Sequence, residues 1–355
     1  MDSSINRRNV LASAVGGFWA VAAPRIVRAQ SAPPPKQSAI DEHSVAAPVS
    51  IEINARPIAS FDPRDHSHVR FGSLQYRSGL VLTSSFRGFG GLSAIRMLDA
   101  KGERFVALSD KGSWFTGRIV YSGREMTGLA DVEAAPILGP DGRPAAARGW
   151  YDTESIAMDG STVYVGIERV NQVLRFDFSK GFTRARGEVV PLPQAARRLP
   201  YNKGLEALVI VPKGHPLAGT LIAISERGLD PQGNLIAFLV GGPTPGQFAV
   251  RRTDNFDVSD AVLLASGDLL VLERKFSWLS GVGIRIRRIP LKAIAPGALV
   301  DGPSIFNADL GHEIDNMEGI DAHVTEDGDT VLTMVSDDNF SLIQRTLILQ
   351  FTLVE

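Results

Sequence analysis

The chain has 355 residues, of which 44% are hydrophobic and 21% are charged, and its formal net charge is −2. This composition is that of an ordinary globular protein, and the absence of an extended run of Lys and Arg argues against a nucleic-acid partner. The sequence contains no cysteine, which excludes disulfides, thiolate metal sites and a cysteine nucleophile. Its 35 glycines and 21 prolines, with few long helical patterns, favour a turn-rich β protein.

Residues 1–29 have the layout of an export signal. The pair Arg7-Arg8 precedes a charge-free stretch, Val10–Ala23, and small residues ending at Ala29 provide a cleavage site. The paired arginines predict a twin-arginine signal, with an ordinary Sec signal as the alternative. The apolar stretch is shorter than the ~18 residues that a membrane-spanning helix needs. We therefore expect an exported protein, periplasmic or secreted, that has no membrane span and acts as a monomer.

The segment 30–50 is rich in Pro, Ala and Ser, a composition typical of a flexible linker. The main domain is expected to occupy residues 51–355. Within it, one pattern recurs five times at an interval of about 56 residues, and a period of this size indicates a repeat architecture. In each copy a polar residue opens an apolar strand, and after a turn a second apolar strand ends in an acidic residue. The opening residues are Ser93, Glu154, Glu206, Asp260 and Glu318. The closing acids are Asp110, Glu168, Glu226, Glu273 and Asp337.

The repeats predict an all-β fold, a six-bladed β-propeller. Continuous apolar runs such as Val163–Ile167 and Leu269–Leu272 are typical of strands buried on both faces. Further strands are expected before the first copy, at 71–85, and after the last, at 346–354. Together these leftover strands amount to about one more repeat unit. The last blade would then be shared between N- and C-terminal strands, which closes the ring without an exposed edge.

If the first strand of each repeat lines the central channel, the opening acids converge on one mouth, and the antiparallel second strands bring the closing acids beside them. Clustered carboxylates repel one another unless a cation or neighbouring bases offset their charge. Calcium is the first choice of cation, because it takes 6–8 oxygen ligands in irregular geometry. The alternative is internal pairing, in which each Glu-Arg step forms a salt bridge to the next blade, and the two arrangements can coexist. The candidate metal ligands are Glu154, Glu206, Asp260, Asp315 and Glu318.

Several of these segments resemble the family known as esterase-like activity of phytase. The resemblance rests on Phe89–Ile95, Ser109–Gly112, Asp152–Ile156, Asn202–Leu208, Leu272–Arg274 and Asp315–Ile320 and covers residues 55–354, with the motifs in the family's order. It implies an exported, propeller-shaped hydrolase whose substrate is a small-molecule ester or phosphate ester. By contrast, the sequence has no Gly-x-Ser-x-Gly motif that would support a serine hydrolase.

On that resemblance, calcium would polarise the ester or phosphate oxygen. Basic side chains would hold the negative charge of the substrate, and an acid, Asp337 or Glu226, would act as general base. The basic residues assigned to this catalytic and substrate-binding role are Lys111, Arg169, Arg227 and Arg274. Two other functions fit the same pattern: a non-catalytic propeller of the cell envelope that binds a ligand or partner, and a lactonase-type propeller hydrolase with a similar central metal.

Overall fold

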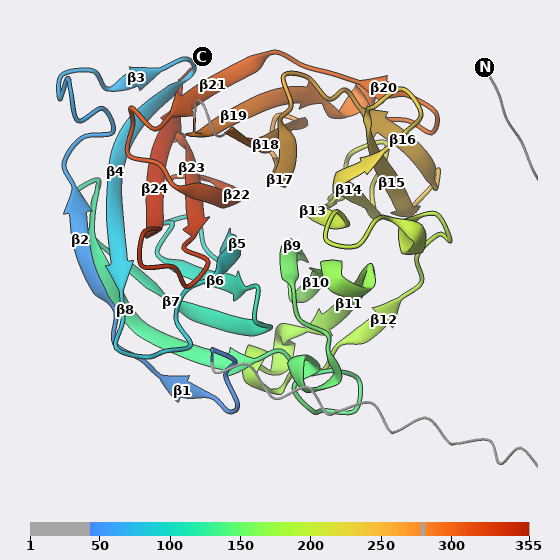
Figure 1. The fold of residues 1–355 in the computed structure, drawn as a ribbon, viewed down its shortest axis with the longest axis horizontal. Helices are drawn as coiled ribbons and strands as arrows, with labels where there is room; N and C mark the ends of the chain where they lie inside the picture. The colour runs from blue at the N-terminus through green and yellow to red at the C-terminus, as the bar shows by residue number, and fades with distance from the viewer. Residues whose placement is uncertain (1–42, 278–280, 355) are drawn as a thin grey trace, which may run out of the picture. The chain divides into compact units, whose positions relative to one another are not determined.

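The computed structural model describes residues 43–277 and 281–354, whose regular elements are β-strands and short 3-10 helices. The strands form five sheets arranged around a common centre (Figure 1), so the fold is an all-β propeller with five blades. The predicted all-β propeller is thus confirmed, but the predicted number of six blades is wrong. The predicted signal peptide and residues 30–42 of the predicted linker lie outside the described residues. The later part of that linker segment contains β1 (Val49–Ser50), which pairs with the first blade.

The first three blades contain four or five strands each. From its outer to its inner strand, the first consists of β1, β8 (Glu125–Pro136), β7 (Ser113–Ser122), β6 (Arg104–Ser109) and β5 (Leu92–Met97). The second consists, in the same order, of β12 (Glu188–Val190), β11 (Gln172–Asp177), β10 (Thr162–Ile167) and β9 (Thr153–Asp159). The third consists of β20 (Leu299–Val300), β16 (Gly246–Val250), β15 (Leu235–Gly241), β14 (Thr220–Leu229) and β13 (Leu205–Ile210).

The last two blades follow the same plan. The fourth consists of β21 (Ser304–Asp309), β19 (Gly281–Pro290), β18 (Asp268–Ser277) and β17 (Asp257–Leu263). The fifth consists of β2 (Asn54–Ile58), β4 (Leu74–Thr83), β24 (Thr346–Leu353), β23 (Thr330–Asp337) and β22 (Asn316–Val324), with β3 (Arg70–Phe71) beside β4. The 3-10 helices are η1 (Ala145–Arg148), η2 (Glu168–Val170), η3 (Phe178–Lys180), η4 (Phe182–Arg184), η5 (Ala196–Arg198) and η6 (Leu291–Ala293). None of the helices in the described part of the chain is long and apolar enough to cross a membrane.

The fifth blade explains the wrong count. Its inner strands β22 and β23 belong to the last repeat, while β24 and the N-terminal strands β4 and β2 complete the same sheet. The strands β24, β4 and β2, which lie outside the five repeats, are therefore the outer part of the fifth blade and do not form a sixth one. The prediction that one blade is shared between the two ends of the chain is correct. This pairing closes the ring and protects the sheet edges that an open array would expose.

Neighbouring blades are held together by apolar side chains between their faces. Trp114 of the first blade packs edge-on against Phe176 of the second, with ring centroids 5.4 Å apart. Phe306 of the fourth blade similarly meets Phe351 of the fifth, at 5.3 Å. All four rings are almost completely buried, and burying a side chain of this size contributes about 1.5–3 kcal/mol. The packing fixes the blades against one another and so fixes the positions of their inner strands.

The inner strands β5, β9, β13, β17 and β22 surround the central axis (Figure 1) and contact one another in that order. In each of them the pairing with the second strand skips one residue near the start. The skipped residues are Ser93, Glu154, Glu206, Ser259 and Glu318. A β-bulge of this kind turns a side chain out of the regular alternation. The bulge is thus the structural form of the sequence repeat.

Candidate acidic site at one mouth of the propeller

The bulged residues form one ring of equivalent positions around the axis, three glutamates and two serines. In the fourth blade the ring position is held by Ser259, whereas the sequence pattern had suggested Asp260. The residue after the bulge is small in the other four blades: Ala94, Ser155, Ala207 and Gly319. Because successive side chains of a strand point to opposite faces, this offset of one residue sends Asp260 in a different direction from the ring.

Asp260 lies in a buried ion pair with Arg96. Its two carboxylate oxygens are 2.9 and 3.1 Å from the Arg96 guanidinium nitrogens, and one oxygen also accepts the Ile320 amide at 3.0 Å. Arg96 in turn donates to backbone carbonyls of several inner strands, including that of Ile320 at 2.9 Å. On their strands Asp260 comes one position after the ring, Ile320 two and Arg96 three, so the pair lies beneath the ring. The carboxylate expected to bind a metal is therefore occupied by an arginine and does not line the mouth cavity.

A second ring follows from the ends of the second strands. The strand registers make the equivalent residues Asp110, Glu168, Glu226, Arg274 and Asp337. The fourth blade again differs, because Arg274 stands where the other blades have an acid. Glu273, one residue earlier, is fully buried and pairs with Arg285 at 2.7 Å and with Arg287 on the neighbouring strand. The expectation that Glu273 joins the acids at the mouth is therefore wrong.

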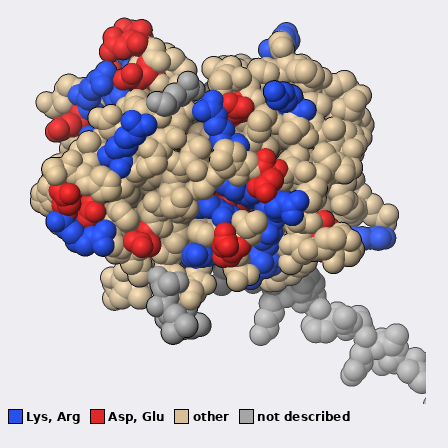
Figure 2. Space-filling model, turned by 90° about the horizontal axis from the view of Figure 1, so that it is seen from above, with Lys and Arg blue, Asp and Glu red and all other residues tan. Residues whose placement is uncertain are grey.

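The two rings border a cavity of about 680 Å³. Its acidic lining residues are Asp110, Asp152, Glu154, Glu168, Glu206, Glu226, Asp257, Asp315, Glu318 and Asp337. Its basic lining residues are Lys203, Arg227, Arg274 and Lys275. Ten acids thus face four bases, and three of the acids, Asp110, Asp257 and Asp315, also pair with bases outside this lining, namely Lys111, Arg252 and Arg345. On the outer side of the molecule shown in Figure 2, by contrast, acidic and basic side chains lie together in several mixed groups.

Part of the negative charge is neutralised by two of the bases. The Arg274 guanidinium lies 2.9 Å from a carboxylate oxygen of Glu318 and 3.4 Å from one of Glu226. The ammonium group of Lys203 lies 2.6 Å from the other oxygen of Glu226. Arg274 also donates to the side-chain oxygen of Asn316 at 2.6 Å. Internal pairing of the predicted kind therefore exists at Arg274, which connects acids of the third and fifth blades, whereas Lys111 pairs with Asp110 of its own blade.

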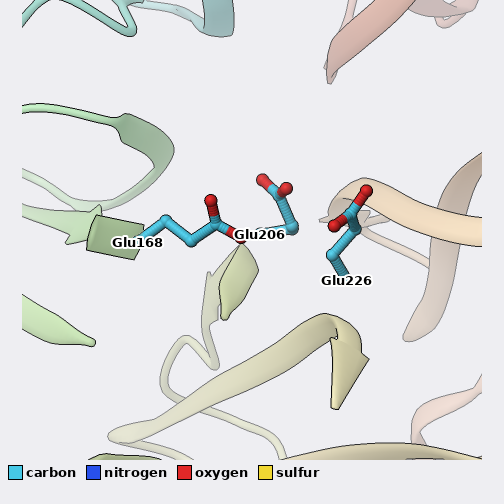
Figure 3. Close-up of side chains that lie close together, drawn as sticks. All are labelled: Glu168, Glu206 and Glu226. Atoms are coloured by element: carbon cyan, nitrogen blue, oxygen red, sulfur yellow. The ribbon is translucent and has the colours of Figure 1, made fainter. Parts of the chain in front are cut away.

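Three glutamates of the second and third blades, Glu168, Glu206 and Glu226, come together beside this pairing. One carboxylate oxygen from each lies within 4.8 Å of the others, and Figure 3 shows Glu206 between the other two. Glu168 accepts the amide of Gly204 at 2.7 Å. Glu206 is only 5% exposed, and among the described residues its carboxylate has no hydrogen bond or ion pair. Calcium binds oxygens at about 2.3–2.6 Å, so two ligands on opposite sides of one ion are about 5 Å apart, and the observed spacing fits one shared cation.

Burial and mutual repulsion raise the pKa values of these acids. Burial, together with the nearby Glu154 and Glu168, holds the pKa of Glu206 well above its usual range. Burial raises the pKa of Glu168 to about 7, although the amide of Gly204 opposes this shift. The pKa of Glu318 is also raised to about 7 by burial, against the opposing effect of Arg274. Burial and the charge of Glu318 raise the pKa of Asp337. Near neutral pH the cluster therefore retains protons in the absence of a cation.

The other predicted site residues are placed as follows. Glu154 and Glu318 line the cavity, as does Asp315, whose carboxylate accepts the Arg345 amide at 3.0 Å. Arg227 also lines it and pairs with Asp257, one nitrogen at 2.8 Å.

Two predicted bases lie outside the cavity lining. Lys111 pairs with Asp110 at 2.9 Å, and Arg169 contacts the ring of Tyr151 and donates to the Tyr201 hydroxyl at 2.6 Å. Sequence reasoning had not assigned a site role to Glu168 or Lys203. The signal for Glu168 was its place at the end of the second strand of the repeat. That for Lys203 was its place next to the motif of the third repeat.

The family described as "Phytase-like: Esterase-like activity of phytase" matches residues 87–340, well over half of the chain. No curated protein matches the sequence significantly. Solved structures with a similar fold include glutaminyl cyclase from Myxococcus xanthus, at 10% identity and TM-score 0.38, over 75% of this chain and 92% of that one. Endo-arabinase from Bacteroides thetaiotaomicron has 12% identity and TM-score 0.41, over 73% and 93% of the two chains. The PQQ-bound aldose sugar dehydrogenase from Streptomyces coelicolor has 12% identity and TM-score 0.36, over 85% and 98%.

Proposed function

Because the chain belongs to the phytase-like family characterised by esterase-like activity, we propose that it is an exported hydrolase of esters or phosphate esters, assisted by calcium at the acidic mouth. The observation that carries this proposal is the approach of the carboxylates of Glu168, Glu206 and Glu226 to within 4.8 Å, with Glu206 buried and unpaired among the described residues. A buried, unpaired carboxylate is costly unless a cation compensates it.

The residues that would hold calcium are Glu206, Glu168 and Glu226, with Glu154, Asp315 and Glu318 lining the same cavity. Their oxygen ligands are the type that calcium prefers. When bound, calcium would supply Lewis-acid polarisation of the ester carbonyl or phosphoryl oxygen. The proposal keeps the metal ligands expected from the sequence, apart from Asp260, whose oxygens pair with Arg96.

The remaining steps fall to side chains of the cavity. Asp337, or an acid beside it, takes a proton from the attacking water, whose oxygen bonds to the acyl carbon or phosphorus. The ester bond breaks, and the acid that took the proton gives it to the leaving oxygen, which departs as the alcohol. A general base works best when its pKa lies near the ambient pH, and the raised pKa of Asp337 moves it in that direction. If the ester is a phosphate ester, Arg227 and Lys203 are the lining bases that would hold its negative charge, in competition with their acidic partners Asp257 and Glu226.

The test uses the mature chain, residues 30–355, purified and treated with a chelator. p-Nitrophenyl acetate and p-nitrophenyl phosphate are assayed with and without added calcium. We expect activity on at least one ester to fall after chelation and to return with calcium, and we expect Glu206→Gln to abolish that return. Glu273→Gln is the matched control, since it changes a buried glutamate outside the cavity. Hydrolysis that is indifferent to both chelation and Glu206→Gln would eliminate the metal-assisted mechanism.

Export is a separate proposal, based on the sequence of residues 1–29. The paired arginines and the short apolar stretch support a twin-arginine route to the periplasm or the medium. Changing Arg7-Arg8 to Lys-Lys should retain the precursor inside the cell if the signal depends on the pair. Continued export of that variant would favour the Sec route.

A further inference from the structure

The lining of the mouth cavity combines charged and apolar side chains. The charged lining residues come from all five blades. The lining from the last two blades also contains five apolar side chains: Phe276, Val282, Leu310, Ile314 and Ile343. These residues adjoin the charged ring directly, because Phe276 comes two residues after Arg274 and Ile314 four residues before Glu318.

Three of these apolar side chains are exposed to an unusual degree. Phe276 is 65% exposed, Leu310 is 61% exposed and Ile343 is 91% exposed. Exposed apolar side chains that are grouped together and bordered by polar residues mark binding surfaces in soluble proteins. In this protein the three side chains line the same cavity as the acids, so a molecule bound at the acids can extend over them. Ligand sites of this kind combine an apolar wall with a few polar groups that orient the ligand.

The charge of the cavity limits which group can bind beside its acids. The acidic lining residues outnumber the basic ones, and three of the four bases, Lys203, Arg227 and Arg274, already pair with acids. A phosphate monoester would bring at least one further negative charge to a site whose bases are mostly occupied, whereas a carboxylic ester brings none. The electrostatics therefore favour an uncharged ester group beside the acids.

We propose that the substrate is a carboxylic ester that carries an apolar group of several carbons, with this group lying on Phe276, Leu310 and Ile343. The inference rests on the proposed hydrolase function and names the substrate class of the same site. Each methylene placed on these side chains loses water contact, and full burial of a methylene is worth about a fourfold gain in affinity. Since this wall covers the chain from one side only, a gain of about two- to threefold per methylene is expected.

The experiment separates binding from turnover. Affinity is measured by titration calorimetry for N-propyl amides of acetic, butanoic and octanoic acid, which resemble the esters in shape and resist hydrolysis. In parallel, kcat/KM is measured for the p-nitrophenyl esters of the same acids and for p-nitrophenyl phosphate. The full chain and two variants, Ile343→Ser and Leu342→Ser, are compared. Leu342 is the matched control, since it neighbours Ile343 and is fully exposed but does not line the cavity.

We expect affinity and kcat/KM to rise two- to threefold per methylene from acetyl to octanoyl. The slope should fall in Ile343→Ser and stay unchanged in Leu342→Ser. Affinity that does not depend on chain length, or absence of amide binding, overturns the inference even if esters are hydrolysed. A chain-length slope in amide binding without hydrolysis of any ester leaves the binding inference standing and refutes the proposed hydrolase. An equal loss in both serine variants would indicate that the whole loop contacts a lipid surface, and would also overturn the inference.

Discussion

The substitution Glu206→Gln should have opposite effects with and without calcium. Glu206 is buried, lies between Glu168 and Glu226, and has no partner among the described residues. Glutamine keeps the shape of the side chain and removes the charge. Without calcium the variant should therefore be more stable than the natural protein, although most substitutions at buried positions destabilise.

The size of the effect follows from the geometry. At the observed limit of 4.8 Å, two carboxylates repel each other by about 3.5 kcal/mol at an effective dielectric constant of about 20. Bound protons and the cations of Arg274 and Lys203 reduce this repulsion. We therefore expect a net gain of about 1–2 kcal/mol in the free energy of unfolding at pH 8. In a domain of about 300 residues, whose entropy of unfolding is about 0.65 kcal/mol/K, such a gain raises the Tm by roughly 1.5–3 °C.

The assay is differential scanning calorimetry in chelator and again in millimolar calcium. The natural protein should gain about 2.7 kcal/mol when calcium exceeds its dissociation constant a hundredfold, and Glu206→Gln should lose most of this gain. Glu273→Gln is the comparison, because it leaves Arg285 and Arg287 without their shared carboxylate. That variant should be destabilised by about 3 kcal/mol and should keep its response to calcium. A lower Tm for Glu206→Gln in chelator, or an intact calcium response, would refute the reasoning.

Three further predictions concern the same charges. Because the folded-state pKa values of Glu168 and Glu318 are raised to about 7, the folded state holds more protons than the unfolded state between pH ~4.5 and ~7, each pKa unit being worth about 1.4 kcal/mol. In chelator the Tm, measured by calorimetry, should therefore fall as the pH rises from 5 to 8. Added calcium should reverse this fall. A Tm that rises over this pH range would contradict the raised pKa values of the cluster. Arg274→Met removes the guanidinium shared by two glutamates and should lower the free energy of unfolding in urea by about 3 kcal/mol at pH 8. The loss should be smaller at pH 5, because the glutamates can be protonated there. Equal losses at both pH values would contradict the pairing. Arg96→Met leaves the buried carboxylate of Asp260 without its partner and should lower the free energy of unfolding by about 3–5 kcal/mol. Calcium binding, measured by calorimetry, should stay intact. Loss of calcium binding would show that the Arg96–Asp260 pair and the acidic mouth above it are coupled.

The repeat spacing was sufficient to predict blades, a shared closing blade and acids at one mouth. The number of blades could not be read from it, since the strands outside the repeats could either form a sheet of their own or extend an existing one. The pairing of β24 with β4 decides the matter. Hydrophobic periodicity shows that a strand is present but does not identify its partner.

The fourth blade shows the second limit of the sequence pattern. Val258-Ser259-Asp260 contains two polar residues in succession, and choosing the acid selected the wrong register. Matching Val258 to the apolar residue before the bulge in other repeats, such as Leu205, would have placed Ser259 in the ring. A one-residue slip along a strand exchanges its two faces. Consequently the pattern also missed that Arg274, and not Glu273, reaches the mouth.

The exceptions in the two rings explain where a cation would bind. Five acids at each level would repel strongly, and the rings instead contain serines at 93 and 259 and an arginine at 274. Arg274 serves Glu226 on one side and Glu318 on the other. Arg274 forms no ion pair with the carboxylates of the second blade or with Glu206 of the third among the described residues. The negative charge that the protein leaves uncompensated is therefore concentrated between these two blades, where three oxygens already have the spacing of ligands around one ion.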